Sequence, residues 1–191
     1  MAQIKSASSA IPANALYLQL AQQQQQQQQA SSGPYTGLAP ASPSIIPPVF
    51  IHPTARVDAS AKLGPNVSIG ARATVAAGAR VRDSIVLEDA EIKHDACVLH
   101  SIVGWGSRVG AWARVEGAPV PPQTHATTIT KNGVRVQTAT ILGKDCVVGD
   151  EVRVQHCVCL PYKELKRVGA PCLVAVAVVI GACAVAFVSG S

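Results

Sequence analysis

Aliphatic residues recur at every sixth position along residues 51–87, and this period constrains the fold more than any other feature of the chain. The first run consists of Ile51, Val57, Leu63, Ile69, Val75, Val81 and Leu87. It continues with slightly irregular steps at Ile92, Val98, Val103, Val109 and Val115, and a second run consists of Leu142, Val148, Val154 and Leu160. A period of six fits neither an α-helix nor an isolated strand. It is typical of the hexapeptide repeat of a parallel β-helix, in which short strands wind around a prism.

This repeat predicts which residues stack and which face inward. Three hexapeptides make one coil of about 18 residues, so Ile51, Ile69 and Leu87 are expected to form one column. A one-residue shortening, such as the step from Leu87 to Ile92, is expected to change the shape of a corner without breaking the stack. The small residues two positions before the aliphatic one are also expected to face the narrow interior: Ala55, Ala61, Val67, Ala73 and Ala79. A β-sandwich, the alternative fold, would instead show strands of alternating polarity with a turn about every 8–12 residues.

Charge and cysteine spacing argue against several classes of function. The net charge of +5 includes no basic run and no interleaving of basic and aromatic residues, so no nucleic-acid partner is expected. The six cysteines form no CxxC pair, which argues against a zinc ribbon. Cys97, Cys146 and Cys157 are expected to serve as small apolar fillers of the interior. No secretory signal is visible, so we expect a cytoplasmic protein with reduced thiols.

Composition divides the chain into four parts. Residues 1–20 are predicted to form a helix. Residues 21–49 contain eight consecutive glutamines and then a stretch rich in Ser, Pro and Gly, which predicts a disordered linker. Residues 50–167 hold the β-helix, and residues 168–191 form an apolar tail. The apolar face of the predicted helix consists of Ile4, Ile11, Ala15, Leu16 and Leu18.

The uncharged stretch 168–189 has two interpretations. It is long enough to cross a bilayer, which needs about 20 residues, and Lys163, Lys166 and Arg167 before it would keep the β-helix in the cytosol. The chain would then be a tail-anchored membrane protein with one transmembrane helix. Many residues of the stretch are Ala, Gly or Cys, which insert weakly, and its composition equally suits a gene-model artefact such as translated intron.

Residues 117–137 interrupt the ladder of aliphatic residues at every sixth position, and they are the best functional candidate within it. Asn132-Gly133 is flanked by Thr128-Ile129-Thr130 and Val134-Arg135-Val136, a pattern that favours a hairpin. A loop of this length in a compact repeat is more often functional or disordered than neutral, and a tolerated surface insertion is the alternative. We therefore name Lys131, Asn132 and Gly133 as a candidate partner-contact loop.

Two tryptophans, Trp105 and Trp112, precede the insertion. Tryptophan carries a large apolar ring with one polar group, and exposed copies more often cover a wall or an interface than bind a small ligand. We name this pair as a candidate interface.

Several motifs resemble a known family. They are Gly-Pro-Asn-Val-Ser-Ile-Gly at 64–70, His-Ser-Ile-Val-Gly-Trp-Gly-Ser at 100–107, Trp-Ala-Arg-Val-Glu-Gly at 112–117 and Leu-Pro-Tyr-Lys-Glu-Leu at 160–165. Together they resemble the C-terminal half of mannose-1-phosphate guanylyltransferases (GDP-mannose pyrophosphorylases). The insertion makes the resemblance closest to the alpha, regulatory-type subunit, and residues 1–20 resemble the last helix of the family's catalytic domain. The resemblance covers about residues 1–20 and 50–167.

The resemblance implies a left-handed parallel β-helix that assembles subunits, in a protein type that regulates GDP-mannose synthesis without catalysing it. Nothing in the chain matches the family's Gly-rich nucleotide-binding loop or its Mg²⁺-binding acids, so no catalytic residue, cofactor or metal site is expected. The insertion is shorter than the family's and contains no acidic residue. The predicted function is a non-catalytic assembly and regulatory module that binds guanylyltransferase catalytic subunits, associates with itself through the β-helix, or does both.

Two other readings stay open. Hexapeptide β-helices also form acyltransferases and gamma-type carbonic anhydrases, which place histidines at coil faces as bases or zinc ligands. His94 and His100 are six residues apart and are therefore expected on neighbouring faces of the prism. The histidines available for such a role are His52, His94, His100, His125 and His156.

The second alternative is that the chain is a truncated gene-model fragment without independent function.

Overall fold

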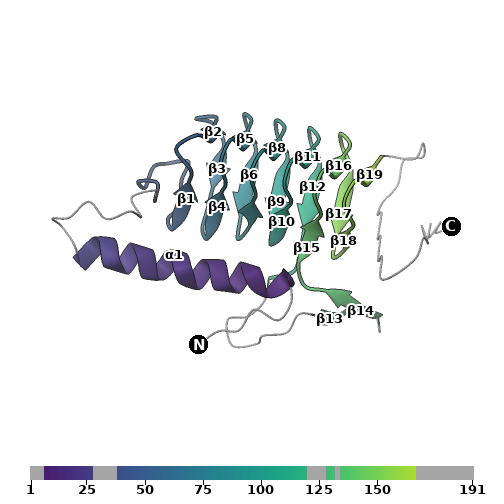
Figure 1. Cartoon of the computed structure of the whole chain (residues 1–191), viewed down its shortest axis with the longest axis horizontal. Helices are drawn as coiled ribbons and strands as arrows, with labels where there is room; N and C mark the ends of the chain where they lie inside the picture. The colour runs from purple at the N-terminus through teal and green to yellow at the C-terminus, as the bar shows by residue number, and fades with distance from the viewer. Residues whose placement is uncertain (1–6, 28–37, 120–127, 132–133, 167–191) are drawn as a thin grey trace.

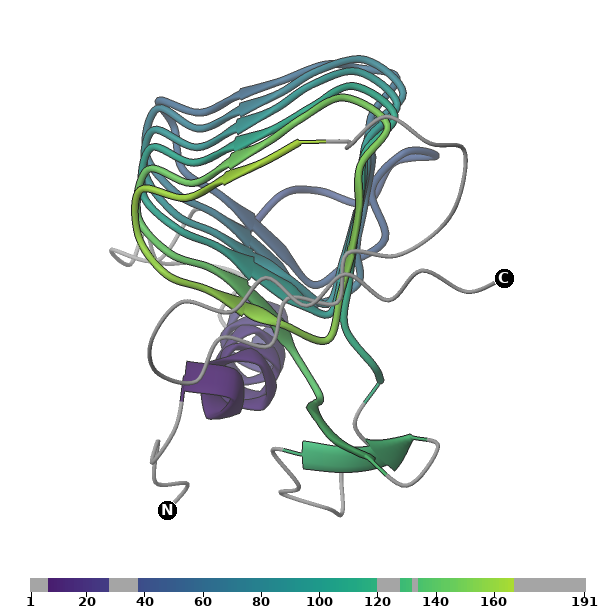
Figure 2. The same ribbon diagram turned by 90° about the vertical axis from the view of Figure 1, so that its right-hand side faces the viewer.

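The computed structural model describes residues 7–27, 38–119, 128–131 and 134–166. Within them, three parallel sheets form the three sides of a left-handed β-helix of about six coils, with a helix along one side and a hairpin projecting from one corner (Figures 1 and 2). The expected mainly-β, hexapeptide-repeat fold is therefore confirmed.

Each coil contributes at most one strand to each sheet, so sheets A and C have six strands and sheet B has five. Sheet A consists of β1 (Val49–Ile51), β4 (Val67–Ile69), β7 (Ile85–Val86), β10 (Ser101–Val103), β15 (Thr140–Leu142) and β18 (Val158–Cys159). Sheet B consists of β3 (Lys62–Leu63), β6 (Arg80–Arg82), β9 (Cys97–Leu99), β12 (Arg114–Glu116) and β17 (Arg153–Gln155). Sheet C consists of β2 (Arg56–Val57), β5 (Thr74–Val75), β8 (Glu91–Ile92), β11 (Arg108–Val109), β16 (Val147–Val148) and β19 (Glu164–Leu165). The chain passes from sheet A to C to B in each coil.

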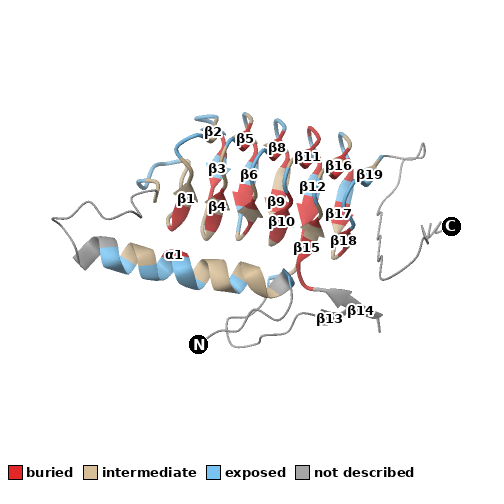
Figure 3. Ribbon diagram, in the orientation of Figure 1, coloured by how far each residue is buried: buried red, intermediate tan, exposed pale blue. Residues whose placement is uncertain are grey.

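The predicted ladder is confirmed on sheets B and C. Their inward positions are Leu63, Val81, Val98, Val115 and Val154, and Val57, Val75, Ile92, Val109, Val148 and Leu165. The small residues expected beside them also face inward, with Ala61, Val67, Ala73 and Ala79 buried and Ala55 partly buried. Figure 3 shows the burial concentrated on the strands, with exposed residues at the corners.

The prediction is wrong at two positions of sheet A. Val86, not Leu87, pairs with Ile69, and Cys159, not Leu160, pairs with Leu142. Val86 is 1% exposed, whereas the Leu160 side chain is 45% exposed. The corner between sheets B and A is one residue shorter in these coils, so the inward position falls one residue earlier. The step from Val81 to Val86 is therefore the shortened one, rather than the predicted step from Leu87 to Ile92.

The cysteines follow the same geometry. Cys146 and Cys157 fill the interior as predicted, and Cys159 joins them. Cys97 does not: it is half-buried on the outer side of sheet B, in register with Arg80 and Arg114. Strand positions alternate between the two sides of a sheet, and Cys97 neighbours the inward Val98.

The N-terminal helix differs from its predicted bounds. A short 3₁₀ helix, η1 (Ala7–Ser9), leads into α1 (Ala10–Gln27), so the helix continues into the glutamine run that was predicted to be disordered. Pro12 lies in the first turn, where the missing N–H has no intrahelical partner, so it does not interrupt the helix. Of the predicted apolar face, Leu18 is fully buried but Leu16 is exposed, and Ile4 lies outside the described residues.

Helix α1 lies along the outer side of sheet A (Figure 2). The outward residues of that sheet are Phe50, Ser68, Ile85, Ile102, Ile141 and Val158. All except Ser68 are apolar, so this side of the prism requires a cover. An isolated helix of this length is marginal in water, and docking on the apolar side of sheet A stabilises it.

Residues 38–48 close the N-terminal end of the prism. Ala39 N donates to Val49 O over 2.8 Å, Leu63 N donates to Ser44 O over 2.8 Å, and Ile46 N donates to Leu63 O over 2.8 Å. These bonds satisfy backbone groups of β1 and β3 that have no neighbouring coil to pair with at this end of the prism. This part of the predicted linker is thus an ordered cap, which protects strand edges that would otherwise be free to associate.

In the described residues, none of the helices has the length and apolarity needed to cross a membrane. The stretch 168–189, for which a transmembrane helix was considered, lies outside those residues.

Val98→Asp tests the interior. Val98 is 0% exposed and stacks between Val81 and Val115 of the neighbouring coils, so a carboxylate there would be buried without a partner. We expect a loss of several kcal/mol of the free energy of unfolding, measured by urea denaturation. Lys62→Asp, on the exposed side of the same sheet, is the control and should change stability by less than about 0.5 kcal/mol. Equal effects of both substitutions would contradict the inward position of Val98.

Candidate partner-binding site

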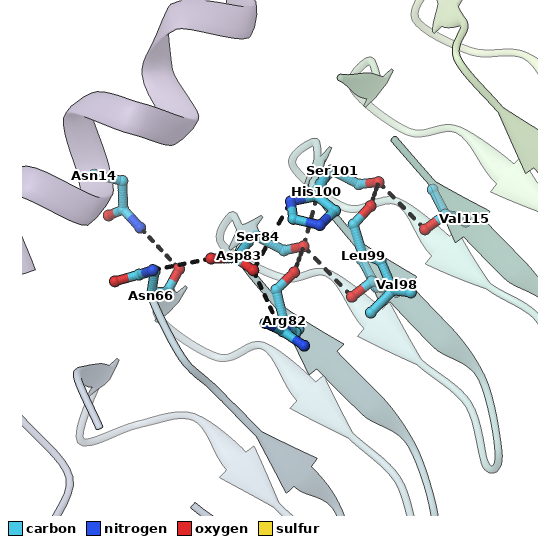
Figure 4. Close-up of polar contacts among 10 residues, drawn as sticks. All are labelled: Asn14, Asn66, Arg82, Asp83, Ser84, Val98, Leu99, His100, Ser101 and Val115. Atoms are coloured by element: carbon cyan, nitrogen blue, oxygen red, sulfur yellow. Dashed lines mark hydrogen bonds and ion pairs between the residues drawn. The ribbon is translucent and has the colours of Figure 1, made fainter. Parts of the chain in front are cut away.

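The corner between sheets B and A carries a column of polar residues beneath α1 (Figure 4). Asn66, Asp83, His100 and His156 occupy equivalent places at this corner, each with a positive φ between 46° and 57°, and the coil between His100 and His156 carries the insertion there instead. Asn and Asp tolerate this left-handed conformation better than most residues. The polar side chains therefore follow from the backbone that the corner requires.

Two fully buried serines fix the shortened form of this corner. The Ser84 hydroxyl donates to Arg82 O over 2.6 Å and accepts from Ser101 N over 3.2 Å. The Ser101 hydroxyl donates to Leu99 O over 2.6 Å. Because these hydroxyls satisfy backbone groups inside the prism, the corner can turn in one residue fewer without leaving those groups unpaired.

Asp83 connects the polar side chains of the corner. Asn66 Nδ2 donates to Asp83 Oδ1 over 2.9 Å, and Arg82 Nε donates to Asp83 Oδ2 over 3.1 Å. His100 Nδ1 lies 3.8 Å from Asp83 Oδ2. Figure 4 shows the three groups converging on this carboxylate.

Helix α1 is fixed to the same corner by Asn14. Its Nδ2 donates to Asn66 O over 3.4 Å, and its Oδ1 accepts from the Ser68 hydroxyl over 2.6 Å. Ser68 is the one polar residue of the outward column of sheet A. The pairing of Asn14 with Ser68 and Asn66 sets the position of the helix along the sheet, because the apolar contacts around it are not directional.

The insertion 117–137 leaves the prism at this corner. Ala118 N donates to Thr138 O over 2.6 Å, so the two ends of the insertion lie side by side. The Thr140 hydroxyl donates to Glu116 O, and His156 N donates to the same oxygen over 3.1 Å. The base of the insertion is therefore part of the hydrogen-bonded stack.

The Glu116 side chain joins the coils on either side of the insertion. It accepts hydrogen bonds from Arg114 Nε over 2.9 Å, from Arg153 Nη2 over 3.1 Å and from Gln155 Nε2. Its side chain is 12% exposed. Burial alone would raise the pKa of Glu116, but the hydrogen bonds from Gln155, Arg114 and Arg153 outweigh it and hold the pKa below its ordinary value.

The predicted hairpin is confirmed. Strands β13 (Thr128–Lys131) and β14 (Val134–Gln137) pair antiparallel, with Lys131 opposite Val134. This register leaves a two-residue connection, as the Asn-Gly pair predicts. Of the candidate contact loop, Lys131 ends β13, whereas Asn132 and Gly133 lie outside the described residues. The hairpin projects away from the prism on the same side as the start of the helix (Figure 2).

The two tryptophans lie elsewhere. Trp105 is in the turn before β11 and Trp112 in the turn after it, and their side chains are 53% and 61% exposed. The structure thus separates the candidate interface from the insertion by one side of the prism, although both are close in sequence.

The described histidines occupy different corners. His52 follows β1, His94 follows β8, and His100 and His156 follow sheet-B strands, so His94 and His100 are on neighbouring corners as expected. His125 lies outside the described residues. In the part of the chain that the structure describes, no group of three or more His, Cys, Asp or Glu side chains is arranged to hold a metal ion.

Sequence reasoning missed the polar corner and the role of Glu116. A signal was present: Asp-Ser at 83–84, His-Ser at 100–101 and His-Cys at 156–157 each precede an apolar strand, and the first two are 17 residues apart. A spacing of 17 instead of 18 marks the shortened corner. For Glu116 no signal exists, because its partner Arg153 is separated from it by the insertion.

Comparison with known proteins gives a family for this fold. Residues 45–171 match the GMPPB C-terminal domain. The chain belongs to the GMPPB C-terminal domain family. The resemblance to mannose-1-phosphate guanylyltransferases drawn from the sequence motifs is thereby confirmed.

Relatives in this family include regulatory subunits. A probable mannose-1-phosphate guanyltransferase of Schizosaccharomyces pombe is 51% identical over 164 residues, which are 86% of this chain and 37% of that protein. The mannose-1-phosphate guanylyltransferase regulatory subunit alpha of Homo sapiens is 45% identical, covering 86% of this chain and 40% of that protein. The regulatory subunit alpha-B of Danio rerio is 43% identical, covering 86% and 39%. The chain thus spans about two-fifths of the length of these relatives.

Likeness to solved structures is remote. The acetyltransferase domain of PglB from Neisseria gonorrhoeae FA1090 superposes with a TM-score of 0.27 at 22% identity, over 60% of this chain and 52% of that one. It carries no conclusion about function.

The polar corner predicts a pH dependence of stability. Burial lowers the pKa of His100 from its ordinary 6.5, against the opposing attraction of Asp83. The unfolded chain therefore binds a proton at His100 before the folded chain does, so the free energy of unfolding should fall as the pH drops below about 6.5. His100→Asn, which suits the positive φ and does not titrate, should flatten this slope in urea titrations between about pH 7.5 and about pH 5. Parallel slopes for the two proteins would contradict the prediction.

Glu116→Gln tests the contact of Glu116 with Arg153 and Gln155, which links the coils before and after the insertion. The substitution keeps the shape but removes the charge that Arg114 and Arg153 share. We expect a loss of about 1 kcal/mol in the free energy of unfolding, because both arginines are about half exposed and water screens the pair. Glu91→Gln, which alters the exposed ion pair with Arg108, is the control and should cost less. If the Glu116→Gln protein is as stable as the parent, the charge of Glu116 is dispensable for stability.

Proposed function

We propose that this chain is an assembly and regulatory module that binds guanylyltransferase catalytic subunits and modulates GDP-mannose synthesis. Membership of the GMPPB C-terminal domain family and relatives named as regulatory alpha subunits support the pathway. The observation that carries the proposal is the insertion: it is a hairpin held away from the prism on a hydrogen-bonded base.

The base makes the hairpin suited to reach a partner. A free loop of about 20 residues would lose much conformational freedom on binding, which weakens affinity. Here the bonds between Ala118 and Thr138, and those of Glu116, hold both ends of the insertion before any partner arrives. Of the candidate contacts, Lys131 ends β13 at the far end of this hairpin, and Asn132 and Gly133 stay candidates from the sequence. The insertion is basic and lacks acidic residues, so the surface it meets is expected to carry carboxylates.

We further propose that the chain does not itself catalyse guanylyl transfer. No stretch of the sequence matches the family's Gly-rich nucleotide loop, and the matched region is about two-fifths of the relatives' length. Catalysis would then come from the partner, and this chain would alter its rate. The cytoplasmic location expected from the sequence stays a prediction.

Excision of the insertion tests the proposal. Because Ala118 N and Thr138 O are hydrogen-bonded, residues 119–137 can be replaced by two glycines without displacing β12 or β15. The full chain should co-elute with a purified mannose-1-phosphate guanylyltransferase catalytic subunit and change its rate of GDP-mannose synthesis. The excised chain should do neither while it keeps the melting temperature of the parent within a few degrees.

Charge reversal refines the test. Lys131→Glu should weaken co-elution, whereas Lys62→Glu, a reversal on the exposed side of sheet B, should not. If the full chain neither co-elutes nor alters synthesis, the proposed function is wrong. If the excised chain binds as well as the parent, the insertion is not the contact.

A further inference from the structure

The outward residues of the three sheets differ in chemistry. Those of sheet A are mainly apolar and lie under α1. On sheet C the aligned outward charges balance, with two arginines against two glutamates: Arg56, Arg108, Glu91 and Glu164. On sheet B five basic residues face outward against the single acidic residue Glu116: Lys62, Arg80, Arg82, Arg114 and Arg153. Sheet B therefore carries most of the net charge of +5.

The parallel register stacks four of these cations in one column. Lys62 pairs with Arg80, Arg80 with Cys97, Cys97 with Arg114, and Arg114 with Arg153. We call these five residues the basic column. Its four steps of about 4.8 Å give it a length of about 19 Å. Consecutive members are 17 to 39 residues apart in the sequence, so no basic run is visible there.

The cations of the basic column are accessible. Arg114 and Arg153 share the carboxylate of Glu116, but 53% and 45% of their side chains stay exposed. Lys62 and Arg80 are exposed as well, and among the described residues neither forms an ion pair. Helix α1 lies along sheet A and the hairpin projects away from the prism, so in the described part of the chain neither of them covers sheet B (Figure 2). The column thus combines unbalanced charge with free access from solvent.

The chain holds no spare segment that could neutralise the basic column. All eleven acidic residues lie between Asp58 and Glu164, within the coils and their corners. No Asp or Glu occurs in the segments outside the described residues, which are 1–6, 28–37, 120–127, 132–133 and 167–191. Neither these segments nor those of a second copy can therefore supply carboxylates, and the anionic groups have to come from a different molecule.

The surroundings of the basic column favour a peptide over other polyanions. Single-stranded nucleic acids bind where bases stack on aromatic side chains, and stable membrane binding combines basic residues with an apolar group that inserts. In the described chain the large exposed apolar residues lie on α1, in the N-terminal cap and at the corners beside sheet C, and none lies on sheet B. Three of the four cations are arginines, whose planar guanidinium binds a carboxylate through two parallel hydrogen bonds.

We propose that the basic column binds an extended acidic peptide segment of another protein, which runs along the prism axis from coil to coil. About six extended residues span about 20 Å, which matches the length of the column. Alternate side chains of such a segment point the same way, so three carboxylates face the four cations. Cys97 is half-buried and short, and its place in the middle of the column leaves room for the peptide backbone between Arg80 and Arg114.

The exposure of the cations sets the expected strength. Ion pairs in contact with water are individually weak, and salt screens them. We therefore expect a dissociation constant of the order of 100 μM at low ionic strength, and binding about tenfold weaker or more in 0.5 M salt. The peptide contacts neither the insertion nor a guanylyltransferase subunit, so this proposal stands or falls separately from the proposed function.

Fluorescence anisotropy with the full chain tests the proposal. The probe is a labelled peptide of about eight residues in which glutamate alternates with serine. Arg80→Glu and Lys62→Glu should each weaken its binding by about fivefold or more, because each reverses a cation that has no partner within the chain. Circular dichroism melting of each variant separates loss of contact from loss of fold.

Glu116→Gln gives a readout of opposite sign. It releases Arg114 and Arg153 from their shared carboxylate, so the peptide should bind about twofold more tightly or better, although the same substitution lowers the stability of the fold. A purely structural role of this side chain would not strengthen binding. Weaker binding by a folded Glu116→Gln chain contradicts the proposal.

Two controls make the result specific. Arg56→Glu reverses an exposed arginine of sheet C that also forms no ion pair among the described residues, and it should leave binding unchanged. A peptide with glutamine in place of glutamate should not bind.

The proposal is overturned if the acidic peptide does not bind at about 1 mM, if the glutamine peptide binds equally well, or if Arg56→Glu weakens binding as much as Arg80→Glu does. An oligonucleotide with the same number of charges, or a vesicle of phosphatidylcholine and phosphatidylserine, also overturns it by binding more tightly than the peptide and losing that binding in Arg80→Glu. The column would then serve another class of polyanion.

Discussion

The structure depends on the bond between each coil and the next. The strands of sheets A, B and C form hydrogen bonds with strands one coil away, and the inward side chains must fit the cross-section that this spacing leaves. Val98, Val103 and Val115 are all fully buried because successive coils stack them without an intervening layer. A polar residue at any of these positions would disturb the coils on both sides, so the ladder tolerates variation only where the chain leaves the strands.

The corners are where this chain differs from a uniform repeat. Ser84 and Ser101 allow one corner to lose a residue, and the same corner releases the insertion after Glu116. The polar groups that result also hold the helix, through Asn14 and Asn66. One corner thus determines three features: the register of sheet A, the position of α1 and the direction of the hairpin. The candidate partner-contact loop therefore depends on this corner, because the insertion that carries it leaves the prism there.

The sequence predicted the prism well because its signal is local. An aliphatic residue at each sixth position indicates an inward strand whatever lies around it, and Asn132-Gly133 indicates a hairpin from its neighbours alone. Leu87 and Leu160 were assigned wrongly because Val86-Leu87 and Cys159-Leu160 each offer two adjacent apolar residues. Which of them faces inward depends on the length of the preceding corner. Glu116 had no local signal, since Arg153 and Gln155 approach it from the next coil.

The sequence by itself determined the repeat, the inward composition and the family, because each rests on short stretches whose chemistry does not depend on distant contacts. Tertiary structure decided the rest. It alone placed Arg108, Val147 and Glu164 in one column, since the first two are 39 positions apart, with the insertion between them, and only the parallel register brings them together. It also decided that the helix continues to Gln27, because docking on the side of sheet A, where Leu18 is buried, stabilises a helix that would be marginal alone.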